Sequence, residues 1–164
     1  MSIGIASWAV LGVALLVARA LFELAPLAVE AVVSGALELS HWAVLATWVV
    51  FNTYAEGYMG FHRKFSPRVV KRAMDLGRNP TLLRVALAAP YCMGLFHAPR
   101  RILLSSWILV FAIAAAVFGV RLLPQPWRGI IDAGVVAGLG IGLLSLLGHF
   151  VAALGHPHPS PEEC

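Results

Sequence analysis

Charged residues are scarce in this sequence. Asp, Glu, Lys and Arg together make up 12% of its 164 residues, about half their share in a typical soluble domain. Hydrophobic residues reach 60%. A soluble fold of this size could not bury so much apolar surface, because small globules keep much of their area in contact with water. The composition therefore excludes an ordinary soluble domain and predicts an integral membrane protein.

Cysteine is nearly absent as well. The two cysteines are Cys92, in an apolar segment, and Cys164, the last residue. This usage provides neither a disulfide framework nor the closely spaced cysteine pairs of a zinc site, and no C-x-x-C-H sequence is present for covalent haem attachment. We therefore expect no structural disulfide and no metal site.

Three common catalytic motifs are missing. The sequence contains no G-x-x-x-x-G-K-[ST], no H-E-x-x-H and no G-x-S-x-G. Their absence argues against a P-loop ATPase, a zinc metalloprotease of that type and a classical serine hydrolase. A membrane enzyme that modifies lipids needs none of these motifs, so that class stays open.

Long apolar stretches are what the sequence has in place of charge. A membrane-spanning helix needs about 20 mostly apolar residues, and the sequence predicts four spans, at residues 2–23, 41–61, 102–122 and 129–154. Between the first two, residues 24–40 include Pro26 and Glu30. We expect a kinked or interfacial helix there, because Glu30 would lie near the membrane centre in a separate span. Residues 1–155 should form one transmembrane helical domain, followed by a flexible tail at residues 156–164.

The basic residues are concentrated in one segment, since nine of the twelve Lys and Arg residues lie between Phe61 and Arg101. Positive charge beside membrane spans is typical of cytoplasmic loops. We therefore expect segment 62–101 and both chain termini to face the cytoplasm of a bacterial inner membrane. Anionic lipid headgroups are the expected partners of the basic side chains, foremost Arg68, Lys71, Arg72, Arg100 and Arg101.

The basic segment also contains two helix-start signals. Ser66-Pro67 predicts an amphipathic helix that ends near Gly77 and lies on the membrane surface. Asn79-Pro80 predicts a second, apolar helix from Thr81 to His97. Because both of its ends are flanked by arginine, we expect it to be re-entrant or to lie at the interface. The predicted fold is thus all-α, with four transmembrane helices and an amphipathic cytoplasmic segment.

Polar residues recur along the second predicted span. The spacing of 7, 4, 4 and 7 residues places them on one helix face, and they are His41, Trp48, Asn52, Glu56 and Arg63. Ionisable groups at membrane depth often mark function, and Glu56 is the candidate proton carrier, cation ligand or acid–base group. The structural alternative is that Glu56 pairs with Arg63 or reaches the headgroups. Elsewhere, i,i+4 spacing predicts the ion pairs Arg19–Glu23, near the membrane surface, and Arg128–Asp132.

The last predicted span contains a glycine row and a histidine. Gly134, Gly138 and Gly142 form a repeated small-x-x-x-small pattern, which lets another helix approach closely. That helix can belong to this chain or to another protein. His149, one turn after Ser145, is the single candidate for a haem or pigment ligand, although no cofactor is predicted beyond bound lipid.

Two functional hypotheses follow from these patterns. The first is a non-enzymatic accessory or assembly subunit of a larger membrane complex, or a homo-oligomer, that docks through the glycine row. The second is a small transporter or lipid-modifying membrane enzyme centred on Asn52, Glu56, His62 and Arg63. The charge pattern gives no reason to expect a nucleic-acid partner.

Overall fold

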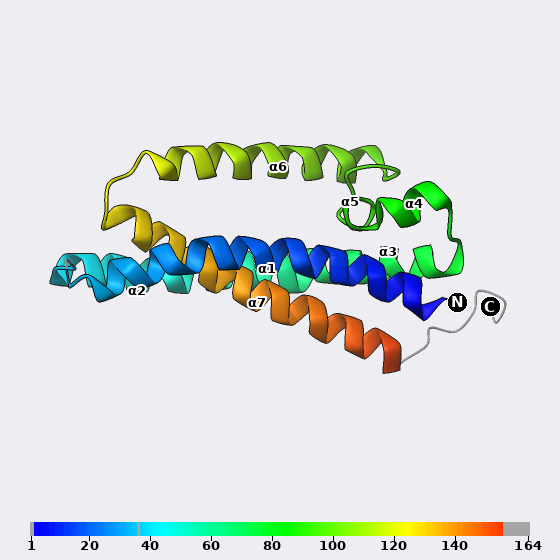
Figure 1. Ribbon diagram of the computed structural model, residues 1–164, viewed down its shortest axis with the longest axis horizontal. Coiled ribbons are helices and arrows are strands. Elements are labelled where there is room, and N and C mark those ends of the chain that lie inside the picture. The colour runs from blue at the N-terminus through cyan, green and yellow to red at the C-terminus, as the bar shows by residue number, and fades with distance from the viewer. Residues whose placement is uncertain (1, 36, 156–164) are drawn as a thin grey trace.

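The protein is almost entirely helical in the computed structural model, which describes residues 2–35 and 37–155 (Figure 1). The elements in chain order are α1 (Ile3–Val33), α2 (Leu39–Asn52), the π-helix η1 (Thr53–Phe65), α3 (Ser66–Arg78), α4 (Leu82–Ala86), α5 (Ala88–Cys92), α6 (Arg100–Arg121) and α7 (Trp127–Gly155). No strand occurs within the described residues, which confirms the all-α class for them. The tail predicted at residues 156–164 lies outside the described part of the chain.

Helix α1 extends ten residues beyond the end of the span predicted at residues 2–23. It passes through Pro26 and ends where Ser34 donates its backbone N–H to the Glu30 carbonyl, at 2.9 Å. Gly35 then adopts a φ of +67°, a left-handed conformation that glycine tolerates and that commonly ends a helix. The segment after Leu24 therefore continues the first helix, instead of forming a separate interfacial one.

The elements α2, η1 and α3 follow one another without a break. Thr53 and Phe65, at the two junctions, both have right-handed helical φ and ψ angles. Ser66 is likewise helical and caps nothing with its side chain. An α-helix does begin at Ser66, as predicted, but it continues a preceding helical segment, so the predicted role of Ser66 as an N-cap is wrong. The proline, which has no N–H to donate, lies where π-helical hydrogen bonding gives way to α-helical bonding.

The amphipathic character of α3 was predicted correctly, but its apolar side faces protein. Val69, Val70, Ala73 and Leu76 are buried in a cluster with residues of α1, α5 and α7, among them Val10, Val13, Tyr91 and Leu146. The expectation that this side would lie in the membrane surface is therefore wrong.

The apolar stretch from Thr81 to His97 is not one helix. It divides into α4 and α5, and turns follow from Met93 to Pro99. Within α5, Ala88, Tyr91 and Cys92 are buried against the cluster at α1 and α3. This compact packing does not confirm a re-entrant helix.

Three helices are long and apolar enough to cross a membrane, namely α1, α6 and α7. This finding supports a membrane protein. The crossing predicted at residues 41–61, within α2 and η1, is not confirmed. The bounds of α6 and α7 agree closely with the spans predicted at 102–122 and 129–154.

The long helices run antiparallel between two ends of a bundle (Figure 1). At the end we call the basic end, Ser2 donates its backbone N–H to the Gly77 carbonyl, at 2.8 Å, and α4 and α5 lie nearby. At the opposite, or far, end Gly129 packs against Leu27 and Ala31 of α1. Helix α6 runs alongside the bundle, and none of its residues is buried in the described structure.

Candidate functional site

The glycine row of α7 faces α2 and η1 of the same chain. A Cβ atom built at Gly134 would lie 2.6 Å from Trp48 Nε1 and 2.9 Å from Asn52 Nδ2. One built at Gly138 would lie 3.2 Å from both the Asn52 carbonyl oxygen and Glu56 Cβ, and Gly142 meets the Phe61 ring in the same way. The partner of the row is therefore a helix of this chain, which leaves the row unavailable for docking another protein.

Three of the five polar-stripe residues, His41, Trp48 and Asn52, have structural contacts. His41 Nδ1 accepts the Glu38 backbone N–H at 3.2 Å, and its ring lies edge-on against Trp127, with centroids 5.0 Å apart, at the far end. Asn52 is 2% exposed and donates to the Trp48 carbonyl at 2.9 Å. Trp48 in turn donates to the Ile131 carbonyl at 3.2 Å. The Trp48 bond joins α2 to α7, and the Asn52 bond satisfies a buried polar group within α2.

The other two stripe candidates remain at the surface and apart. Glu56 is exposed beside Gly138, and Arg63 reaches only Met59 Sδ, at 3.9 Å. The described residues show no ion pair between Glu56 and Arg63, so the expected alternative pairing does not form. The stripe does not converge: His41 lies at the far end, Asn52 is enclosed, Glu56 lies against α7 beside Gly138, and Arg63 is exposed.

A contact between two histidines, His62 and His149, lies near the basic end and was not predicted from the sequence. His62 of η1 forms a hydrogen bond between Nδ1 and Ser145 Oγ of α7, at 3.0 Å. Its ring also meets His149 edge-on, with centroids 4.9 Å apart. The spacing of Ser145 and His149 on one face of α7 was visible, but their partner lies 83 residues away from Ser145. Among the described residues, no group of three or more His, Cys, Asp or Glu side chains is placed to hold a metal ion.

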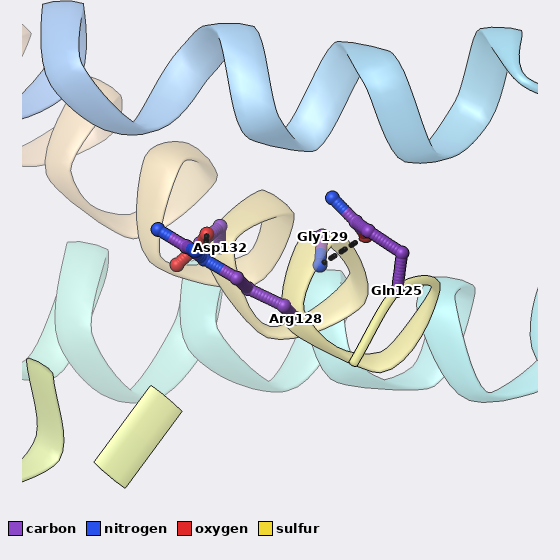
Figure 2. A network of polar contacts seen from close by, with 4 residues as sticks. All are labelled: Gln125, Arg128, Gly129 and Asp132. Atoms are coloured by element: carbon purple, nitrogen blue, oxygen red, sulfur yellow. Dashed lines mark hydrogen bonds and ion pairs between the residues drawn. The ribbon is translucent and has the colours of Figure 1, made fainter. Parts of the chain in front are cut away.

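Figure 2 shows the polar contacts at the start of α7. Gln125 Oε1 accepts the Gly129 backbone N–H at 3.2 Å, which satisfies one of the free donors at a helix N-terminus. Arg128 Nε and Asp132 Oδ2 form the predicted ion pair at 3.8 Å. Asp132 is 4% exposed, and a carboxylate in the first turns of a helix interacts favourably with the helix dipole.

Arg72 holds the turn that follows α5. Its guanidinium donates to the Phe96 and His97 carbonyls, at 3.1 Å each, and lies 4.2 Å above the Tyr91 ring. His97 has a φ of +49°, an uncommon conformation for a residue with a side chain. Arg72 thus has structural partners, whereas the other predicted headgroup-binding residues are exposed: Arg68, Lys71, Arg100 and Arg101.

Cys92, in α5 near Arg72, is 2% exposed. Burial raises the pKa of its thiol to about 12, and the nearby positive charge of Arg72 offsets part of that rise. The neutral thiol therefore prevails at physiological pH, and it packs as a small apolar group.

A groove separates α3 from the end of α7. It has a volume of about 490 Å³, and its lining combines cationic and apolar side chains: Pro67, Val70, Lys71, Met74, Asp75, Arg78, His149 and Ala153. Lys71 was predicted as a headgroup-binding residue, but its place in one groove with Arg78 and His149 was not predicted.

The middle of α1 carries an exposed ion pair. Arg19 and Glu23 lie 3.1 Å apart, as the spacing predicted, and their side chains are 79% and 60% exposed. Phe22, next to them, is 84% exposed. No residue of α1 between Leu15 and Leu27 is buried in the described structure. An exposed charge pair in the middle of an apolar helix is the least expected surface feature of the molecule.

No known protein family matches this chain, and neither a curated protein nor a solved structure shows significant similarity to it.

Proposed function

We propose that this protein is a non-catalytic subunit of a larger membrane assembly and docks through the outward face of α1 at Arg19 and Glu23. The observation that carries the proposal is the exposure of this ion pair on an apolar helix. The position of the pair relative to the membrane decides how unfavourable that exposure is.

Tryptophan side chains provide a scale for depth, because they favour the two membrane–water interfaces. Trp8 is exposed near the basic end and donates to the Val85 carbonyl of α4. Trp127 is exposed at the far end, two residues before Gly129, which packs against Ala31. Trp8 and Ala31 are about 34 Å apart along α1 at ~1.5 Å per residue, close to the ~30 Å thickness of a hydrocarbon core. Arg19 lies midway between them.

In this arrangement the pair would lie near the membrane centre, where contact with lipid is unfavourable. A charged residue at the centre of a spanning helix costs about 2.5–3.5 kcal/mol on insertion scales. Pairing lowers that cost, but 79% and 60% exposure leaves both side chains facing outward. Intramembrane charges usually face other protein or a water-filled cavity. A polar group on a partner helix would satisfy the pair.

Helix α6 supports the same proposal. It is a spanning-length helix with no buried residue in the described structure, so most of its surface remains open for contact with a partner. The full proposal includes four crossings, a cytoplasmic basic end and both termini in the cytoplasm. The uninterrupted helix through α2, η1 and α3 is long enough for the fourth crossing.

The alternative, a transporter or lipid-modifying enzyme at the polar stripe, receives less support from the geometry. Asn52 is enclosed by Trp48 and the glycine row, and Glu56 and Arg63 do not pair. The groove between α3 and α7 does not include Asn52 or Glu56 in its lining.

Site-specific photocrosslinking in the native membrane tests the docking face. A benzophenone amino acid at position 22 should give a protein adduct of one defined mass. The same probe at position 144 of α7, where Leu144 is 71% exposed, should give lipid adducts only. Exchanging the charges, as Arg19→Glu with Glu23→Arg, preserves the internal pair but should abolish the protein adduct. Lipid adducts alone at position 22 would refute the proposal.

A further inference from the structure

The groove between α3 and α7 is unusual because its cations have no partners. Neither Lys71 nor Arg78 makes a hydrogen bond or ion pair through its side chain in the described structure, although Asp75 lines the same groove. Arg72, by contrast, donates to the Phe96 and His97 carbonyls. The groove thus contains two free positive charges that the fold does not use.

The residues of α3 form two different surfaces of the groove, one polar and one apolar. Lys71, Asp75 and Arg78 follow one another at i, i+4 and i+7, so they share one face of the helix. Their side chains are exposed and form a polar rim. Val70 and Met74, at intermediate positions, are buried or half-buried and form an apolar floor. A polar rim beside an apolar floor fits a ligand that is itself amphipathic.

The opposite wall and the position of the groove narrow the choice of ligand. His149 and Ala153 of α7 form that wall, and α7 ends at Gly155. Arg78 is the last residue of α3, at the basic end. The groove therefore leads from the span of α7 towards the end of the bundle where positive charge is concentrated. A ligand in it would have its charged part at Lys71 and Arg78 and its apolar part beside Ala153.

We propose that this groove binds an anionic phospholipid, with the phosphate between Lys71 and Arg78 and an acyl chain along Val70, Met74 and Ala153. Two cations and one carboxylate, Asp75, give the rim a net positive charge that complements the phosphate. The carboxylate can accept a hydrogen bond from a headgroup hydroxyl, which makes phosphatidylglycerol the fitting class. This site is independent of the docking face on α1.

Native mass spectrometry of the full chain, purified in detergent and titrated with phosphatidylglycerol or phosphatidylcholine, tests the site. We expect one phosphatidylglycerol per chain to bind in preference to phosphatidylcholine. Removing both cations, as Lys71→Ala with Arg78→Ala, should weaken binding roughly 10–30-fold at ~1 kcal/mol per cation. The matched control, Arg100→Ala with Arg101→Ala, removes the same charge from an exposed position outside the groove and should change binding less than about threefold.

A second variant separates the groove from general electrostatics. Ala153→Phe retains every charge but narrows the groove from its opposite wall, and it should weaken binding of the intact lipid by a similar factor. Inorganic phosphate in excess should not displace the lipid. Equal losses in the groove and control double variants, or displacement by phosphate, would overturn the proposal. Helical circular dichroism of each variant verifies that the fold is intact.

Discussion

The tight packing of α2 against the glycine row predicts that one added methyl group at Gly134 destabilises the protein. A Cβ there would lie 2.6 Å from Trp48 Nε1 and 2.9 Å from Asn52 Nδ2. Neither group is free to move, because Trp48 donates to the Ile131 carbonyl and Asn52 donates to the Trp48 carbonyl. Relief of the contact must therefore shift the helices apart or break one of these hydrogen bonds.

The expected size of the effect follows from three contributions to the free energy of unfolding. Overpacking a well-packed interior typically costs about 1–3 kcal/mol, and a lost hydrogen bond adds roughly 0.5–1.5 kcal/mol. Replacing glycine by alanine within a helix stabilises the folded state by about 1 kcal/mol, because alanine has the higher helix propensity. The sum gives a destabilisation of about 0.5–3.5 kcal/mol for Gly134→Ala.

Gly140, which follows Gly134 on the same helix, provides a matched control. A Cβ at Gly140 meets nothing within 4 Å, so Gly140→Ala should stabilise the protein by up to about 1 kcal/mol. Both variants can be unfolded reversibly in mixed micelles by raising the fraction of a denaturing detergent, with helical circular dichroism as the readout. If Gly134→Ala proves as stable as Gly140→Ala, the packing argument for the glycine row is wrong.

Two further predictions concern the basic end. Since burial raises the pKa of the Cys92 thiol to about 12, its thiolate fraction at pH 8 is about a thousandth of that of an ordinary thiol. In a Cys164→Ser variant, iodoacetamide should therefore label Cys92 about a thousandfold more slowly in the folded than in the unfolded protein. The labelling rate of the folded protein should rise about tenfold per pH unit up to pH 11. Fast labelling of the folded protein at pH 8 would contradict this prediction. Arg72→Ala should destabilise the protein by about 2–4 kcal/mol, because it removes the hydrogen bonds to both carbonyls and the contact with Tyr91. Arg72→Lys should destabilise it less than Arg72→Ala, although lysine cannot bond both carbonyls while it stacks on Tyr91. Thermal unfolding in detergent measures the difference in stability.

Features set by neighbouring residues could be predicted from the sequence. The bounds of α6 and α7 agree with the predicted spans because Arg100, Arg121 and the prolines at 124 and 126 interrupt a long apolar run. The pairs Arg19–Glu23 and Arg128–Asp132 formed because i,i+4 residues on a helix are neighbours whatever surrounds them.

Features set by distant residues could not be predicted. Ser66-Pro67 has the composition of a helix start, yet the helix already extends from Leu39, so the same dipeptide lies in its interior. The apolar side of α3 resembles that of a membrane-surface helix, and only the fold shows α1 and α7 covering it. The hydrogen bond between His62 and Ser145 joins residues 83 positions apart, and no local pattern in the sequence predicts it.

The glycine row illustrates why the choice of partner was the hardest part of the site to predict. Small residues show that a helix surface permits close approach, but they do not identify the helix that approaches. Once α2 and η1 occupy the row, any contact with another protein must use surfaces that remain open. On α1 and α6 those surfaces consist of large apolar side chains such as Phe22 and Phe111, for which lipid is an adequate solvent. Arg19 and Glu23 are the exception, because lipid cannot satisfy them. The proposed docking therefore depends on the two charged residues of α1 more than on the larger apolar surface around them.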